Sequence, residues 1–304
     1  MTTETAAAPA TELITTGKSL GRRRRRRGTR ATVTSIVKHI ALVAVSLVML
    51  YPLIWLVVSS LKPNDEIFRD LSIFTTDLTL DNYVSGWNDL QAPFGLYLGN
   101  SMIISVGAII GNLISCSLAA YAFARLRFRG RNLYFAIMLI GIMLPFQVVL
   151  IPQFVIFQQL GWLNTFLPLI VPKFLATDAF FIFLMVQFIR ALPNEIFEAA
   201  KIDGAGHLRM FAQITLPLMI PALVTTAIFT FIWTWGDFFG PLIYLREPGM
   251  FPAQVALKGF IDAQEASNFG AMFAMSVVSL LPLFIVFLIG QRFLLRGFAT
   301  TGIK

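Results

Sequence analysis

Residues 190–217 read RALPNEIFEAAKIDGAGHLRMFAQITLP, a polar and charged stretch that separates two strongly apolar segments. Asn194 is a suitable helix cap, and the glutamates that follow it suit the positive end of a helix dipole. We therefore expect a short helix from Glu195 to Asp203, ended by Gly204-Ala205-Gly206. A second short helix should follow and should stop before Pro217, because proline cannot continue a helix.

The composition around this loop is that of an integral membrane protein. Of the 304 residues, 57% are hydrophobic and 13% are charged, whereas a soluble domain carries about 25% charged residues. Cys116, the one cysteine, lies within an apolar run and is expected to be a small packing residue. His39 and His207 are far apart, and no cysteine–histidine cluster has the spacing of a metal site.

Six apolar segments are long enough to cross a bilayer, which requires about 20 residues in a helix. They are Ile40–Leu61, Leu96–Phe123, Leu133–Phe157, Phe166–Ile189, Leu218–Tyr244 and Phe269–Phe293. The predicted fold class is therefore an all-α polytopic membrane protein with six transmembrane helices.

The basic residues set the orientation of these segments, because cytoplasmic loops carry an excess of lysine and arginine. Most of the 24 basic residues fall in the N-terminal tail, in the loops after the second and fourth segments, and at the C-terminus. The opposite loops are acidic or neutral, as in residues 62–93. Both termini and residues 190–216 are therefore predicted to be cytoplasmic.

Residues 1–35 are polar and rich in threonine, alanine and arginine, which predicts a disordered basic cytoplasmic tail. Residues 36–304 form the predicted transmembrane domain. The run Arg22–Arg27 is interpreted as a topology determinant that also touches anionic membrane lipid. Binding of nucleic acid is the disfavoured alternative.

The loop at 190–216 has features that suit docking to another protein. Ala199, Ala200 and Gly204 are small, so a second backbone could approach closely, while Phe197 and Ile202 offer apolar anchors. Phe211 is expected to pin the unit to the membrane helices. The residues alone leave open an ordinary helical hairpin that packs only on its own bundle.

The spacing of this loop also resembles a family signature. Glu198-Ala199-Ala200, three residues, Gly204, nine residues, Ile214, one residue and Leu216-Pro217 match the loop of binding-protein-dependent ABC transporter permeases. Over residues 36–304 the chain is similar to the carbohydrate-uptake branch, specifically to the six-span second membrane subunit of maltose-type importers. The segments that carry this likeness are Tyr51–Trp55, Ser60–Pro63, Asn100-Ser101, Pro152–Phe154, Leu160–Thr165, Trp235–Phe238, Gln291–Phe293 and Arg296-Gly297.

The resemblance implies a non-catalytic permease of a bacterial cell membrane. Residues implied to couple this chain to an ATPase are Glu198, Ala199, Ala200, Asp203 and Gly204. The implied partners are a second permease subunit in a heterodimer, a dimer of ATP-binding subunits, and an extracytoplasmic solute-binding protein that delivers a carbohydrate.

This chain lacks a Gly-x-x-x-x-Gly-Lys-Ser/Thr loop, the motif that binds the phosphates of ATP. We therefore expect the chain to bind no cofactor and the partner ATPase to use the ATP–Mg. The tail Arg296–Lys304 is implied to reach toward the ATPase, and the loop Arg246–Asn268 toward the binding protein.

The fifth apolar segment supplies a candidate substrate pathway. Trp233, Trp235, Asp237 and Phe239 combine aromatic faces with a carboxylate, which suits a sugar because rings stack on C–H faces and the carboxylate accepts hydroxyl protons. Packing against the partner subunit is the alternative. Lys173 and Asp178 also lie within an apolar segment, where charges normally face a cavity or each other.

Two other classes of membrane protein match these residues less well. A secondary transporter or channel subunit would show paired charges deep in several spans and inverted repeats, and neither is clear. An intramembrane aspartyl protease could use Asp178 and Asp237. Its Gly-x-Gly-Asp pattern is incomplete here, since Thr234 stands in place of the first glycine.

Overall fold

A computed structural model describes residues 29–73, 77–261 and 267–299. The chain divides into a unit that ends at Pro52 and a larger unit that begins at Leu53. Helix α1 begins at Thr29, so most of the predicted tail 1–35, including Arg22–Arg27, lies outside the described residues. The last residues of the predicted C-terminal tail, 300–304, lie outside them as well.

Within the described ranges every regular element is helical. In chain order they are α1 (Thr29–Ser59), α2 (Asp81–Asn88), α3 (Phe94–Arg125), α4 (Arg131–Ile142), α5 (Phe146–Gln159), α6 (Leu167–Ile170), the 3₁₀ turn η1 (Val171–Leu175), α7 (Ala179–Ala191), α8 (Asn194–Ile202), α9 (His207–Met210), the π turn η2 (Phe211–Thr215), α10 (Leu216–Leu218), α11 (Ile220–Trp235), α12 (Phe239–Tyr244), the 3₁₀ turn η3 (Pro248–Met250), α13 (Ala253–Ala256), the 3₁₀ turn η4 (Leu257–Phe260) and α14 (Phe269–Ala299).

Four helices in the described part are long and apolar enough to cross a membrane, or up to six if each of two bent pairs is one span. The four are Thr34–Ser59, Phe94–Arg125, Leu167–Ala191 and Phe269–Phe293. The pairs are Arg131–Ile142 with Phe146–Gln159, bent by 103°, and His207–Leu218 with Ile220–Trp235, bent by 74°. The predicted all-α membrane architecture is confirmed at this level.

Helix α3 is the centre of the larger unit and packs against α6, η1, α7 and α11. Its fully buried face includes Cys116, which was predicted to be a small packing residue and lies in one buried cluster with Phe181 and Met185 of α7. Gly107 and Gly111 bring α3 close to the α6–η1 segment: a Cβ on Gly107 would lie 3.0 Å from Ile170, and one on Gly111 would lie 3.0 Å from the Lys173 carbonyl carbon. Small residues four apart commonly allow such close helix packing in membranes.

The predicted span Phe166–Ile189 is broken in its middle. Ala176 ends η1 in the left-handed conformation, with φ of 55°, and α7 restarts at Ala179. Carbonyl groups freed by the break find side-chain donors: Ser115 donates to the Lys173 carbonyl at 2.6 Å, and Thr177 donates to the Pro172 carbonyl at 2.9 Å. Irregular backbone at membrane depth is stable only when its polar groups are satisfied in this way.

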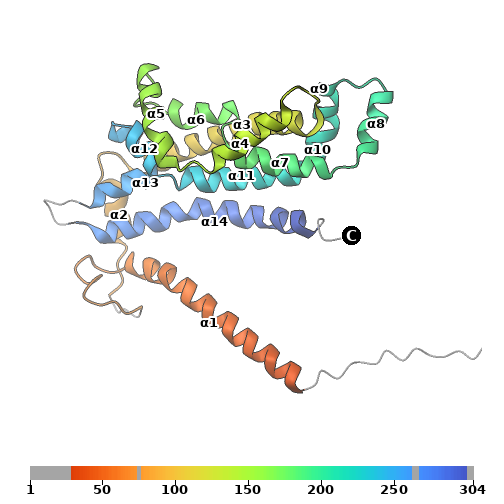
Figure 1. Ribbon diagram of the computed structural model, residues 1–304. Coiled ribbons are helices and arrows are strands. Elements are labelled where there is room, and N and C mark those ends of the chain that lie inside the picture. The colour runs from red at the N-terminus through yellow and green to blue at the C-terminus, as the bar shows by residue number, and fades with distance from the viewer. Residues whose placement is uncertain (1–28, 74–76, 262–266, 300–304) are drawn as a thin grey trace, which may run out of the picture. The chain divides into compact units, whose positions relative to one another are not determined.

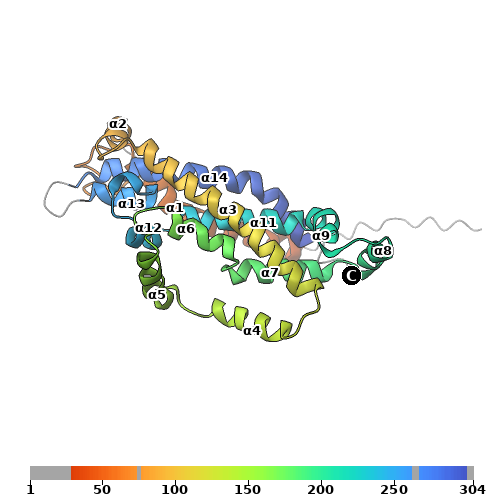
Figure 2. The ribbon, with the colours of Figure 1, turned by 90° about the horizontal axis from the view of Figure 1, so that it is seen from above.

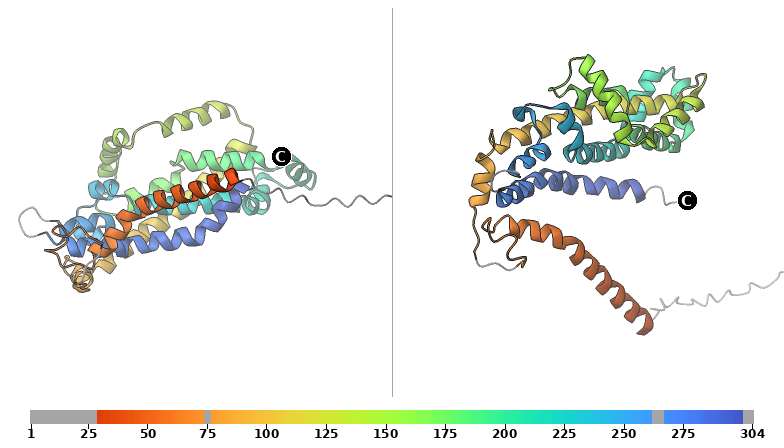
Figure 3. Two further views of the ribbon diagram at one scale, coloured as in Figure 1. Left: turned by 90° about the horizontal axis from the view of Figure 1, so that it is seen from below. Right: turned by 60° about the vertical axis from the view of Figure 1, so that its left-hand side comes forward.

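The helical arm α4–α5 runs along the outside of the larger unit. Figure 2 shows the two helices beside the bundle of α3, α7 and α11, and the left view of Figure 3 shows the same separation. The arm is held at its two ends. Phe135 of α4 stacks on Phe183 with ring centroids 6.4 Å apart, and Phe157 of α5 meets Tyr244 edge-on at 5.2 Å.

The predicted outer segment between the first two spans is folded around Lys62, whose side chain is 1% exposed. Its ammonium donates to the carbonyls of Asp70 at 2.6 Å and Ser72 at 2.7 Å. The Ser72 backbone N–H, which donates to the Asp70 carboxylate, is the main cause of the lowered pKa of Asp70. Asn82 of α2 donates to the carbonyls of Ser60 and Lys62, so α2 is fastened to the residues that follow the end of α1 and satisfies their carbonyl groups.

The second short helix of the polar loop runs further than predicted. It continues through Pro217 to Leu218, and the bend falls at Met219, which has φ of −91° and ψ of 10°. The turn before the proline, η2, is π-helical, and the Thr215 hydroxyl donates to the Met210 carbonyl five residues back at 3.3 Å. This wide turn accommodates a residue that lacks an N–H.

Candidate functional site

The polar loop forms a hairpin of α8 and α9 at one end of the larger unit, opposite the end that holds α2, α12 and α13 (Figure 1). Glu195 lies in the first turn of α8 and Lys201 in the last, as the helix dipole favours. Gly204 then takes φ of +76°. The Ala205 N–H bonds the Ala200 carbonyl and the Gly204 N–H bonds that of Lys201, a pairing that requires a left-handed residue after the helix.

Arg125, the last residue of α3, fixes the start of α8. Its guanidinium donates to Asn194 Oδ1 at 2.5 Å and to the carbonyls of Ile189 at 2.7 Å and Leu192 at 3.0 Å. It also lies 3.8 Å from the ring centroid of Phe197. One cation thus satisfies the carbonyl groups at the end of α7 and orients the helix that follows.

Aromatic contacts fix the second half of the hairpin. Phe211 meets Tyr121 of α3 edge-on, with ring centroids 5.4 Å apart, which confirms that Phe211 pins the loop to the membrane helices. The Tyr121 hydroxyl lies 3.3 Å from His207 Nδ1. The hairpin is therefore a rigid extension of α3 and α7.

The residues predicted to couple to a partner divide between two faces of α8. Glu198, Ala199, Asp203 and Gly204 are exposed, whereas Ala200 is buried and packs with Phe197 in the core. Two large apolar side chains beside them point outward without cover: Ile202 is 88% exposed and Leu208 is 80% exposed. Exposed apolar groups of this kind mark interaction surfaces.

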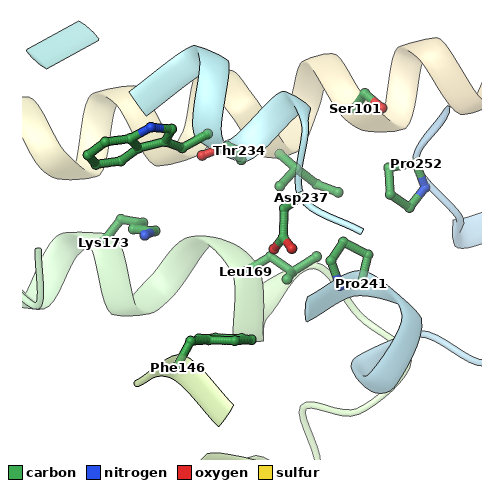
Figure 4. Close-up of a pocket in the computed structure, with 10 residues that line it drawn as sticks. Ser101, Phe146, Leu169, Lys173, Thr234, Asp237, Pro241 and Pro252 are labelled. Atoms are coloured by element: carbon green, nitrogen blue, oxygen red, sulfur yellow. The ribbon is translucent and has the colours of Figure 1, made fainter. Parts of the chain in front are cut away.

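A cavity of about 250 Å³, with a mostly apolar wall and two charged groups, lies among the apolar helices (Figure 4). Its charged groups are Lys173 of η1 and Asp237, and Trp233 forms part of its wall. The other lining residues are Ser101, Ile104, Phe146, Leu169, Thr234, Pro241 and Pro252. A neighbouring cavity of about 380 Å³ shares Trp233 and includes Asp178 in its lining.

Lys173 and Asp178 form an ion pair between these two cavities, as the sequence suggested. The Lys173 ammonium lies 2.9 Å from Asp178 Oδ2 and 3.1 Å from Oδ1. Asn112 of α3 donates to the same carboxylate at 2.6 Å and to Thr230 of α11 at 3.1 Å. The network ties both halves of the broken span to α3 and α11, while the two charged side chains stay 29% and 24% exposed.

The two tryptophans of the fifth segment have different surroundings. Trp233 is 51% exposed and lines the cavities. Trp235 is 1% exposed, stacks on Phe231 with centroids 5.2 Å apart, and donates its indole N–H to the Ser279 carbonyl of α14 at 3.0 Å. Trp235 is thus committed to packing between α11 and α14.

Asp237 follows the end of α11 and accepts the Gly240 N–H at 3.2 Å, so it caps the start of α12 while its carboxylate faces the cavity. Phe239 on α12 is 62% exposed.

Asp178 and Asp237, the two residues of the aspartyl-protease alternative, have separate partners. Asp178 binds Lys173 and Asn112, and Asp237 accepts the Gly240 N–H. Within the described residues, no group of three or more histidine, cysteine, aspartate or glutamate side chains is placed to hold a metal ion.

The fold and these two sites define a class: an all-helical polytopic membrane protein with a cavity that holds charged groups among its spans and a hairpin packed against α3 and α7 at one end. The model of one family, "Binding-protein-dependent transport system inner membrane component", matches residues 111–299. The chain belongs to this family and is a membrane permease subunit of an ABC importer.

Curated relatives match over nearly their whole length. The chain is 32% identical over 263 residues to the arabinooligosaccharides transport system permease protein AraQ of Halalkalibacterium halodurans, a match that covers 86% of this chain and 93% of the relative. It is 32% identical over 257 residues to the diacetylchitobiose uptake system permease protein NgcG of Streptomyces coelicolor, covering 84% of each chain.

A solved structure confirms the architecture. The crystal structure of a bacterial ABC transporter involved in the import of the acidic polysaccharide alginate contains a chain that matches with a TM-score of 0.76 and 25% sequence identity. The match covers 87% of this chain and 97% of that chain. The helical arrangement is therefore that of an ABC importer permease.

Proposed function

We propose that this chain is one of two different permease subunits of an ATP-driven bacterial importer, and that it translocates a carbohydrate through the inner membrane. Residues 36–304 form the permease domain, with six spans and with both termini in the cytoplasm. Residues 1–35 form a basic tail. The names of the relatives AraQ and NgcG support an oligosaccharide substrate.

The observation that carries the carbohydrate assignment is the cavity that brings Trp233, Lys173 and Asp237 together. A half-exposed indole offers a face for the C–H side of a sugar ring. An ammonium and a carboxylate on the same cavity offer a donor and an acceptor for hydroxyl groups. Trp235, predicted to lie on this pathway, instead packs α11 against α14 and is not among the residues that line the cavity. The exposed Phe239 is assigned to contact with the second permease subunit.

The hairpin 190–216 is the proposed coupling site for a separate ATPase subunit. Glu198, Ala199, Asp203 and Gly204 meet the ATPase, Ile202 and Leu208 supply apolar anchors, and Ala200 holds the helix to its own bundle. The ATPase dimer binds and hydrolyses the ATP–Mg. Because its closure moves a hairpin that Arg125 and Phe211 fasten rigidly to α3, the motion passes into the helices around the cavity.

The opposite end of the unit is the proposed contact for the solute-binding protein, through the loop Arg246–Asn268. Amide side chains fasten the first part of this loop, residues 246–251. Asn164 Oδ1 accepts the N–H groups of Arg246 and Glu247, each at 3.0 Å. Asn100 donates to the carbonyls of Gly249 at 2.9 Å and Phe251 at 3.0 Å. A fixed backbone at residues 246–251 favours the capture of a partner because little conformational entropy is lost there on binding.

The substrate assignment is tested with the variants Asp237→Ala and Trp233→Ala in transporter reconstituted with its partner subunits. Each variant removes a hydrogen bond or a stacking contact of about 0.5–1.5 kcal/mol, so the KM for uptake of an oligosaccharide should rise by up to roughly tenfold. Asp89→Ala and Trp87→Ala are matched controls on the α2 segment, away from the cavity. Unchanged uptake kinetics for Asp237→Ala and Trp233→Ala would leave both residues with a structural role only.

A further inference from the structure

A polar cavity of about 350 Å³ lies where the hairpin meets the ends of α3 and α4. It is lined by Tyr121, Ala124, Arg125, Arg127, Arg131, Asn194, Phe197, Glu198, Lys201, His207 and Met210. Three arginines and one lysine therefore surround a space that contains one carboxylate. A cavity of about 430 Å³ next to it shares Arg127 and Arg131 and is also lined by Leu133 at the start of α4.

Two of these cations are already committed to the protein. Arg125 binds Asn194 and two carbonyl groups at the start of α8, and Arg131 donates to the Leu126 carbonyl at 3.3 Å. Arg127 and Lys201 differ from them. Across the described part of the chain, neither side chain has an ion pair or a hydrogen bond. The cavity therefore has two uncommitted cations on opposite elements, the α3–α4 loop and α8.

We propose that this cavity binds a phosphate-bearing anion, held between Arg127 and Lys201. A guanidinium binds phosphate through paired N–H donors, and a lysine ammonium adds a point charge with rotatable donors. Neighbouring cations that repel one another are stabilised by an anion between them. The phosphate belongs either to an anionic lipid headgroup or to a soluble phosphorylated molecule.

The surroundings of the cavity include a surface that suits a lipid. Leu133 and Tyr134, at the start of α4, are 63% and 57% exposed, so apolar surface for an acyl chain adjoins the basic cavity. Basic pockets between membrane helices on the cytoplasmic side commonly hold lipid headgroups. The inference uses the proposed cytoplasmic location of the hairpin and goes beyond the transport function. An occupant would join α8 to the α3–α4 loop and restrain the hairpin.

The test uses the whole transporter in nanodiscs of phosphatidylcholine, with or without phosphatidylglycerol, and counts bound lipid by native mass spectrometry. The double variant Arg127→Gln with Lys201→Gln should retain roughly tenfold less phosphatidylglycerol than the wild type, because two charge-assisted contacts are lost. The matched control, Arg129→Gln with Arg209→Gln, removes the same charge from the α3–α4 loop and from α9 of the hairpin, at residues that line neither cavity. This control should bind like the wild type.

Inorganic phosphate added to phosphatidylcholine-only nanodiscs distinguishes the sources. Retention of phosphatidylglycerol without phosphate binding assigns a lipid headgroup, whereas phosphate binding that is lost in the Arg127–Lys201 variant assigns a soluble anion. Equal binding by the two double variants would overturn the proposal. A complex that binds neither phosphatidylglycerol nor phosphate would also overturn the proposal; this result is expected if an acidic segment of the ATPase fills the cavity. ATP hydrolysis stimulated by the loaded binding protein, measured on the control variant, tests the transport function separately.

Discussion

Gly111 determines how closely α3 approaches the broken fourth span. A Cβ at this position would lie 2.8 Å from the Phe174 ring and 3.0 Å from the Lys173 carbonyl carbon, and that carbon belongs to the backbone. The backbone cannot move aside without disturbing the Ser115 hydrogen bond to the same carbonyl. The packing that places Lys173 beside Asp178 therefore depends on a missing side chain.

We predict that Gly111→Ala lowers the thermal stability of the purified subunit, because overpacking of this kind costs about 1–3 kcal/mol. Gly99→Ala is the matched control: it changes the same residue type on the same helix, where a Cβ would meet nothing within 4 Å. Thermal unfolding in detergent measures both. Equal midpoints for the two variants would show that α3 and η1 are less tightly packed than described.

Single residues also mark the limit of what the sequence could reveal. Trp233 and Trp235 are two positions apart, so on a helix they point to nearly opposite sides, and only one of them could face a cavity. The sequence could not indicate which one. The left-handed Ala176 was equally hidden, since alanine has no preference for that conformation and Ser115, which satisfies the neighbouring carbonyl, is distant in the chain.

Among the elements, the α8–α9 hairpin was the most predictable. The glutamates and Gly204 act locally, and local signals for helix starts and turns are readable without tertiary contacts. Asn194 was predicted wrongly as the cap: it lies inside α8, and its side chain accepts a hydrogen bond from Arg125 of α3. The end of the second helix was predicted wrongly at Pro217 because the π turn before it is stabilised by its own geometry and by Thr215. Pro145 and Pro152 lie in the predicted span Leu133–Phe157, but a proline in a sequence does not specify how sharply α4 and α5 bend.

The exposed apolar pair on the hairpin provides a prediction for this element. Ile202→Ser and Leu208→Ser should weaken assembly with the ATPase, since each large apolar side chain contributes about 1.5–3 kcal/mol when it is buried. Both are exposed in this chain, so the folded permease should keep its thermal midpoint. Co-purification of the ATPase measures the effect. The control Arg209→Ser changes an exposed polar neighbour that lines neither basic cavity. Undiminished recovery of ATPase with the two serine variants would rule out these anchors.

For the whole molecule, the orientation rests on the distribution of arginine and lysine. Cys116 is the one cysteine, and it is buried, so replacing it by alanine gives a background for labelling. In intact cells a membrane-impermeant maleimide should label a cysteine at Asp89 and should not label one at Glu195. Both positions are exposed. Labelling of Glu195→Cys from outside would reverse the proposed topology and place the hairpin away from ATP.

The central claim is that the hairpin 190–216 couples this permease to a separate ATPase, and Gly204 tests it most directly. Its φ of +76° strains any other residue, while a Cβ there would meet nothing within 4 Å, so substitution alters the turn and its outer face without disturbing the core. In proteoliposomes that contain the complete transporter, Gly204→Arg should abolish ATP-driven uptake and its stimulation by the loaded binding protein, while Gly206→Ala transports normally. Full transport by Gly204→Arg would contradict the account.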